Sequence, residues 1–148
     1  MEKDPIFRLA YVSEASPHFG PDDLHEIEER SLVRNEELDI TGILVMDAGK
    51  ILQILEGSQQ KVEALFARIA RDPRHQNVHQ VAGSVVAGRL LHSWSLVSGE
   101  GRKIPGGMTE AFHALHHKLT IRTDLTQLGE GEIDLLKVVS LLRSVPLS

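Results

Sequence analysis

Two short apolar segments joined by a tight turn, with a helical pattern on either side, constrain the fold of this chain most strongly. Residues 40–46 and 51–55 are rich in aliphatic side chains, and the sequence Asp47-Ala48-Gly49-Lys50 between them is typical of a hairpin turn. Residues 6–13 alternate between two faces and predict a strand before the hairpin. A strand pair of this kind must bury its apolar face against other elements of the same chain.

Amphipathic helices are expected before and after the hairpin. The first begins at Pro21, since proline is tolerated at a first helical position, and runs to about Asn35. The second is expected to be capped by Ser58 and to stop before Pro73. Two more strands are predicted after the second helix, at residues 78–87 and 90–98.

The element order is therefore βαββαββ. The first six elements are those of a ferredoxin-like α+β fold, and the last strand is an addition to it. We expect both helices on the same face of the sheet. Residues 1–98 form this domain, and residues 99–148 are expected to be a glycine-rich linker followed by helices at about 109–120 and 130–143. The last helix carries an apolar stripe of Leu135, Val138, Val139 and Leu142, which must pack on the sheet or on another subunit.

Composition excludes several classes of function. A net charge of −5 disfavours nucleic acid as a direct partner, because phosphate binding needs a basic face. There is no apolar run of about 18 residues, so we expect no membrane span. The chain has no cysteine, which removes disulfides, thiolate nucleophiles and cysteine-based metal sites, and fits a cytoplasmic protein.

Gln53 is a polar residue in the middle of an apolar strand. Its amide has two N–H donors and a carbonyl acceptor, and burying such a group without partners costs about 1–3 kcal/mol. Tyr11 on the first strand can face the same helical layer, and Asn35 at the end of the first helix can face the gap between the helices. A phenol and two amides around one slot are suited to holding a flat ring by its edge.

Each of these residues also has an ordinary structural explanation. Alone, Tyr11 is more often a core tyrosine, Gln53 an amide bridging strands, and Asn35 a helix cap. A separate group, His113, His116 and His117, has a helical spacing compatible with zinc, but a solvated, partly charged helix face explains it better because no residue that would hold the imidazole rings in place is evident, and we assign no metal.

Five blocks in order nevertheless resemble the BLUF domains, which are flavin-based blue-light sensors. The resemblance covers roughly residues 6 to 98, and the short chain resembles members that carry no enzymatic domain. The matching blocks are Arg8-Leu9-Ala10-Tyr11-Val12-Ser13, Asn35 with Ile40-Thr41-Gly42-Ile43-Leu44, Ile51-Leu52-Gln53-Ile54-Leu55-Glu56-Gly57, Asp72-Pro73-Arg74-His75, and Arg89-Leu90-Leu91-His92-Ser93-Trp94-Ser95.

The resemblance implies that FAD or FMN lies between the two helices. Tyr11 matches the family's redox-active tyrosine and Gln53 its switching glutamine. Asn35 matches a residue that holds the C4 carbonyl side of the ring, and Trp94 one tied to signalling. The remaining matches are Ile27 against the ring and Asp72, Arg74 and His75 near the ribityl and phosphate side.

Two departures from the family pattern concern the site. Arg34 precedes Asn35 where many members have asparagine or histidine, and we expect it to contact flavin oxygens or the phosphate. Leu96 stands where many members have methionine, so a methionine-dependent relay is not expected here.

The sequence thus predicts a blue-light photoreceptor that is not an enzyme. We expect it to form homo-oligomers and to act on a downstream signalling protein. Two alternatives are a flavin- or nucleotide-binding module without a photocycle and an acylphosphatase-like enzyme. The enzyme would need an Arg–Asn pair in a phosphate-binding loop after the first strand, and that loop is not evident.

Overall fold

The protein is a five-stranded sheet with helices on both faces. The computed structural model describes residues 5–98 and 106–121. Along the sheet the strand order is β4-β1-β3-β2-β5, and β2 and β5 are the parallel pair. The elements are β1 (Ile6–Ala15), α1 (Pro21–Glu37), β2 (Thr41–Asp47), β3 (Lys50–Gly57), α2 (Gln59–Ala70), β4 (His75–Val86), β5 (Trp94–Ser98) and α3 (Gly106–Ile121).

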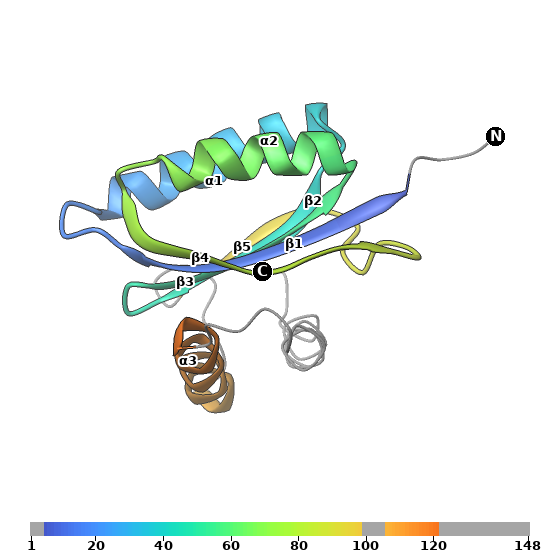
Figure 1. Ribbon diagram of the computed structural model, residues 1–148. Coiled ribbons are helices and arrows are strands. Elements are labelled where there is room, and N and C mark those ends of the chain that lie inside the picture. The colour runs from blue at the N-terminus through green and yellow to red at the C-terminus, as the bar shows by residue number, and fades with distance from the viewer. Residues whose placement is uncertain (1–4, 99–105, 122–148) are drawn as a thin grey trace.

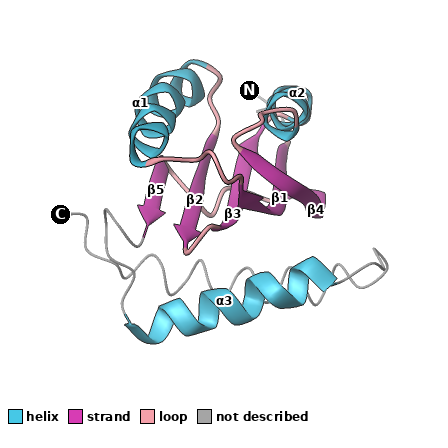
Figure 2. Cartoon of the chain, turned by 90° about the vertical axis from the view of Figure 1, so that its left-hand side faces the viewer, coloured by secondary structure: helices cyan, strands magenta, loops and turns pink. Residues whose placement is uncertain are grey.

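The predicted ferredoxin-like order with an added strand is confirmed. Helices α1 and α2 lie together on one face of the sheet, and α3 crosses the other face (Figures 1 and 2). The sheet therefore has an apolar layer on each side. The α1–α2 layer includes Leu9, Tyr11, Leu55, Val62 and Trp94. The α3 layer includes Val12, Val45, Leu52, Phe112, Leu115 and Leu119.

The last strand is shorter than the sequence predicted. Residues 90–93 are not part of β5, which begins at Trp94. The N–H groups of Leu90 and Leu91 donate to the carboxylate of Glu56, at 3.0 and 2.7 Å to Oε1, and not to a neighbouring strand. A side chain thus takes the place of the ladder hydrogen bonds that these residues would need in a strand.

The helix starts follow the expected chemistry only in part. Helix α1 begins at Pro21, and Asp23 Oδ2 accepts a hydrogen bond from the Gly20 N–H at 2.9 Å. It continues to Glu37, so Asn35 lies inside the last turn and is not its cap. Ser58 is the N-cap of α2, but its side chain makes no capping hydrogen bond.

Helix α3 covers the expected helical segment 109–120 and extends beyond it at both ends. The predicted helix at 130–143 and its apolar stripe lie outside the described residues. No helix in the described part of the chain is long and apolar enough to cross a membrane.

Gly42 lies where two strands approach closely. A Cβ atom on Gly42 would come within 2.1 Å of the Ile54 carbonyl oxygen. Ile54 is on β3, so the absence of a side chain at Gly42 lets β2 approach β3 closely.

Glu56 is a fully buried carboxylate that ties three parts of the chain together. It accepts from Arg8 Nε at 3.0 Å and from the N–H groups of Leu90 and Leu91. Arg89 adds hydrogen bonds to the Thr41 hydroxyl at 2.8 Å and to the Glu56 carbonyl at 3.0 Å. The segment that leads into Trp94 is therefore fixed to β1, β2 and β3.

We expect Glu56→Ala to destabilise the fold by about 3–5 kcal/mol. The substitution removes the buried carboxylate partner of Arg8 and the acceptor of two N–H groups at once. Urea denaturation measures the loss. The control is Glu63→Ala on the exposed face of α2, which is expected to change stability by no more than about 0.5 kcal/mol. Equal effects of the two substitutions would contradict the role given to Glu56.

Candidate functional site

A cavity of about 380 Å³ opens between α1 and α2 above the centre of the sheet. This volume is within the range of pockets that hold small molecules. Apolar side chains form part of its wall, and a tyrosine, a glutamine and several arginines form the rest. The lining residues are Tyr11, Phe19, Ile27, Arg30, Ser31, Arg34, Leu44, Ile51, Gln53, Arg68, Ile69, Asp72, Arg74 and His75.

Gln53 is hydrogen-bonded on both sides. Its Nε2 donates to the Tyr11 hydroxyl oxygen at 2.6 Å, and its Oε1 accepts from the indole Nε1 of Trp94 at 3.2 Å. Tyr11 and Gln53 are direct partners in the β1–β3 register, so their side chains share the α1–α2 face. Trp94 reaches Gln53 from β5, across β2. All three side chains are at least 94% buried.

The indole determines how the Gln53 amide is oriented. An indole N–H can only donate, so the atom that faces Trp94 must be the amide oxygen. The amide nitrogen then faces Tyr11, whose hydroxyl oxygen accepts, and the Tyr11 O–H proton remains available to another acceptor. Rotating the amide by 180° would let Tyr11 donate to Gln53 but would place two donors between Gln53 and Trp94. The network therefore has two arrangements, and only one of them contains the hydrogen bond from Trp94 to Gln53.

Tyr11 lies in surroundings that keep it protonated. It is 2% exposed, and its ring packs against Phe66 at a centroid distance of 5.3 Å and against His75 at 6.1 Å. Burial raises the pKa of Tyr11 well above its usual value, which the hydrogen bond from Gln53 offsets only in part. The phenol is therefore neutral at any physiological pH.

Asn35 has a buried donor without a partner. The side chain is fully buried, its Oδ1 accepts from Arg34 Nε at 3.3 Å, and its Nδ2 makes no hydrogen bond. Arg34 also donates to the Ser31 hydroxyl at 3.3 Å and lines the cavity. Native structures leave few buried polar groups unpaired, so the Asn35 amide is a candidate for a ligand contact.

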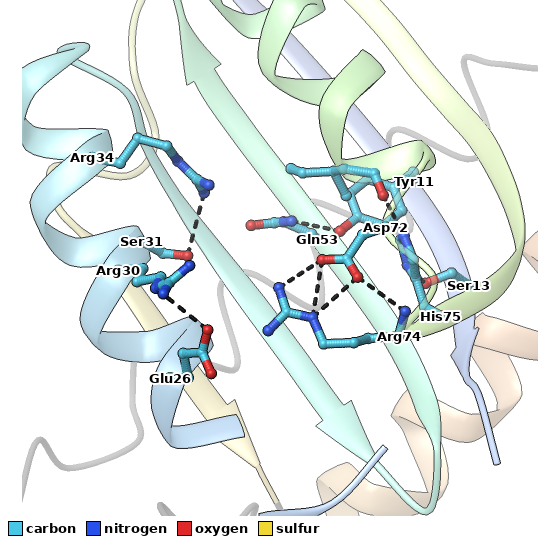
Figure 3. Close-up of polar contacts among 11 residues, drawn as sticks. Tyr11, Ser13, Glu26, Arg30, Ser31, Arg34, Gln53, Asp72, Arg74 and His75 are labelled. Carbon is cyan, nitrogen blue, oxygen red and sulfur yellow. Dashed lines mark hydrogen bonds and ion pairs between the residues drawn. The ribbon is translucent and has the colours of Figure 1, made fainter. Parts of the chain in front are cut away.

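Asp72, Arg74 and His75 form the opposite side of the site (Figure 3). Asp72 and Arg74 make a close ion pair, at 2.6 Å from Nη2 to Oδ2, and hydrogen bonding from Arg74 lowers the pKa of Asp72. His75 Nδ1 is 2.9 Å from the Ser13 hydroxyl, and its Nε2 is 2.5 Å from the Ile69 carbonyl oxygen. Both ring nitrogens of His75 therefore have a partner within hydrogen-bonding distance.

The cavity is basic although the chain is acidic. Four arginines and one aspartate line it, which gives a local charge of +3 with histidine neutral, against −5 for the whole chain. Burial lowers the pKa of Arg34, and repulsion from Arg68 and Arg74 lowers it further. Such a site favours a ligand with an anionic group.

The structure brings most of the predicted site residues together. Tyr11, Ile27, Arg34, Gln53, Asp72, Arg74 and His75 line the cavity. Asn35 and Trp94 lie behind the lining and contact it through Arg34 and Gln53. Leu96 is buried on the α1–α2 face, where it pairs with Leu44 on β2.

Sequence reasoning missed several residues of the site. Ser31 and Arg30 lie one turn from Arg34 on the same face of α1, and Arg30 is a cavity residue although the sequence favoured an exposed helix face for it. Arg68 reaches the cavity from α2. Ser13, the partner of His75, carried no signal as a candidate because serine is common at any position of a strand.

The three histidines considered for zinc do not converge. His113 Nε2 bonds Asp47 Oδ2 at 2.6 Å, His116 Nε2 bonds the Ser13 carbonyl at 2.8 Å, and His117 is exposed. No group of three metal-ligating side chains occurs within residues 5–98 and 106–121. The loop after β1 contains neither arginine nor asparagine, so the acylphosphatase alternative has no phosphate-binding loop there.

Known proteins with related sequences include subunits of photoactivated adenylate cyclases. The photoactivated adenylate cyclase subunit beta of Euglena gracilis is 30% identical over 97 residues, which cover 64% of this chain and 11% of that protein. The alpha subunit is 33% identical over 88 residues, or 60% of this chain and 9% of that protein. The chain thus spans about a tenth of the length of these curated relatives.

This chain is also similar to solved structures of BLUF proteins. BlrB, described as a BLUF protein in its dark state, is 28% identical with a TM-score of 0.69, and the match covers 94% of this chain and 96% of BlrB. BlrP1 of Klebsiella pneumoniae, solved with FMN and cyclic diGMP, is 31% identical with a TM-score of 0.62 over 71% of this chain and 29% of BlrP1.

The family profile described as sensors of blue-light using FAD matches residues 6–97. The match covers β1 to β5 almost completely, and with them every residue that lines the cavity. The chain therefore belongs to the BLUF family of flavin-based blue-light sensors.

Proposed function

We propose that the cavity between α1 and α2 holds the flavin ring of FAD or FMN, and that Tyr11 and Gln53 carry out the light response. The observation that carries this proposal is the position of Gln53, whose amide is bonded on one side to the only tyrosine of the chain and on the other to its only tryptophan. A change in the hydrogen bonding of either partner alters the orientation that the buried amide prefers.

The residues present fit a flavin. Ile27, Leu44 and Ile51 supply apolar contacts for the faces of a ring. Gln53 has one amide hydrogen and one lone pair beyond its two bonds, and Asn35 Nδ2 is a buried donor without a partner. These groups match a ring edge that carries both acceptors and donors. The arginines at the cavity match the phosphate of FMN or FAD.

Tyr11 is the proposed electron and proton donor. A flavin that has absorbed blue light supplies an acceptor for one electron and one proton. Tyr11 is buried and neutral, so loss of an electron requires its hydroxyl proton to leave as well. The proton is available because the Tyr11 oxygen accepts from Gln53 and does not donate to it. The electron and proton then return to Tyr11, so no net oxidation remains.

Gln53 is the proposed switch. Its amide reorients or tautomerises while the proton is away from Tyr11, so that the carbonyl or imidic group presents a different pattern to the ring. The rearrangement disturbs the hydrogen bond to Trp94, because the indole accepts nothing and requires an acceptor on Gln53. The result is a polar network with two arrangements of similar energy.

The anionic group of the ligand leads to a prediction about cofactor choice. We expect FMN to bind at least about tenfold more tightly than riboflavin at low salt, because the cavity carries a local charge of +3. The difference should shrink at 1 M salt, where the Debye length is about 3 Å. Quenching of flavin fluorescence measures both affinities. Equal affinities at low salt would show that the arginines do not meet a phosphate.

The output goes to an effector. Relatives are named as photoactivated adenylate cyclase subunits, and BlrP1 was solved with cyclic diGMP. Those names support the proposal that residues 1–98 sense light and that residues 99–148 pass the change to a partner, which is a signalling protein or a second copy of this chain. The family itself is described as sensors of blue light that use FAD.

A blue-light absorption spectrum separates this proposal from a flavin module without a photocycle. A photoreceptor of the proposed kind shows a reversible red shift of the flavin band, whereas simple photoreduction bleaches it. A protein that binds no flavin would overturn the proposal as a whole.

A further inference from the structure

Ser13 is in contact with both layers of the protein. Its hydroxyl faces the α1–α2 side, where it lies 2.9 Å from Nδ1 of His75, a residue of the cavity wall. Its carbonyl oxygen lies 2.8 Å from Nε2 of His116 on α3, which packs on the opposite side of the sheet. Ser13 is 1% exposed, and its contact with His116 is buried.

The chemistry of the partners fixes the direction of these hydrogen bonds. His75 Nε2 faces the Ile69 carbonyl, which can only accept, so Nε2 carries a proton, and Nδ1 lies within hydrogen-bonding distance of the Ser13 hydroxyl. His116 Nε2 likewise faces a carbonyl and must donate. Burial lowers the pKa of His116, so its ring is neutral at pH 7. The chain of bonds runs from Ile69 through His75 and Ser13 to His116.

A bulge in the sheet lies at this position. On β4, Gln76 pairs with Glu14 and His79 pairs with Val12, so two residues of β4 lie opposite Ser13 alone. One of them, Asn77, has a φ of 55° in the left-handed region. The β1–β4 register therefore skips Ser13, and its carbonyl meets the imidazole of α3.

We propose that Ser13 and His116 are positioning residues that couple the cavity to the docking of α3. The proposal rests on the proposed function, because it takes the flavin as the ligand whose contact with His75 is transmitted. Binding free energies are reciprocal, so a ligand that tightens the contact of α3 with the sheet must itself bind more weakly when that contact is lost. This makes the affinity for FMN a measure of the coupling.

The chain contains a matched control on the same helix. His113 lies one turn before His116, and both rings contact Phe112, at centroid distances of 5.8 and 6.1 Å. His113 bonds Asp47, in the hairpin end of β2, and neither residue lines the cavity. Loss of His113 also removes a contact between α3 and the sheet, but it breaks no bond that leads to the cavity.

The experiment uses the full chain and FMN as the ligand. We expect His116→Leu to weaken FMN binding about fivefold or more, within the usual range of coupling between two sites, and His113→Leu to leave it unchanged. His116→Gln keeps an N–H donor near the position of Nε2 and should restore most of the affinity. Ser13→Ala keeps the carbonyl but removes the hydroxyl, so in that background His116→Leu should have little further effect.

Hydrogen exchange of α3 gives a second measurement that needs no variant. Backbone amides of residues 106–121 should exchange more slowly in the FMN-bound protein than in the free protein. Equal loss of FMN affinity in His113→Leu and His116→Leu, or identical exchange of α3 with and without FMN, would overturn the coupling while leaving the flavin site intact. A chain that binds no FMN would overturn the site and the coupling together.

Discussion

Replacing Gln53 by leucine is expected to leave flavin bound and to abolish the light-induced red shift. Leucine keeps most of the volume and fills the same buried place on β3, so the cavity retains its shape. The loss of amide hydrogen bonds should weaken flavin binding by about 1–3 kcal/mol. No amide then remains beside Tyr11 that can exchange a donor for an acceptor.

Absorption spectra before and after blue light measure this effect, and fluorescence titration measures the affinity. The control is Gln80→Leu on β4. Gln80 is the partner of Tyr11 in the β1–β4 register, but it is exposed and does not line the cavity. An intact red shift in Gln53→Leu would show that another group provides the switch.

The second large effect is expected from Tyr11→Phe. Tyr11 is the only tyrosine, so this substitution removes every phenol from the chain. Packing against Phe66 is preserved, because the ring remains. Flavin should bind, but the stable shifted state should not form, since the donor of the electron and proton is absent. The rate of flavin fluorescence decay should fall for the same reason.

A Tyr11→Phe protein with a normal light response would contradict the assignment of the donor. Trp94 is then the next candidate, because its indole reaches Gln53 directly. The variant Trp94→Phe decides between them. If Tyr11 is the donor, Trp94→Phe retains the shift but changes the stability of the shifted state, because the indole fixes the orientation of the Gln53 amide in the arrangement seen here.

The sequence predicted the fold well because its signals are local. The hairpin turn, the proline at the start of α1 and the alternation in β1 each depend on a few neighbouring residues. The extent of β5 depends instead on Glu56, whose carboxylate is 34 and 35 positions away from the N–H groups that it binds. No local pattern marks residues 90–93 as lacking a strand partner.

The sequence predicted many of the residues that form the site, but it did not predict how their side chains are hydrogen-bonded. Tyr11 and Gln53 could be placed on one face by strand alternation and resemblance to the family. The orientation of the Gln53 amide could not, because it depends on Trp94, which reaches it from the edge of the sheet. The link from Ser13 to His116 depends on a bulge between β1 and β4, and no sequence pattern predicts that bulge.

The most direct test of the account is one difference spectrum. The purified full-length chain, loaded with FMN or FAD, is illuminated with blue light, and its absorption is compared with that of the dark sample and followed during return to darkness. The account predicts a red shift of the flavin band that reverses fully in the dark, because the electron and proton return to Tyr11 and only the hydrogen bonds of Gln53 change. Irreversible bleaching, or a spectrum that light does not alter, would contradict it.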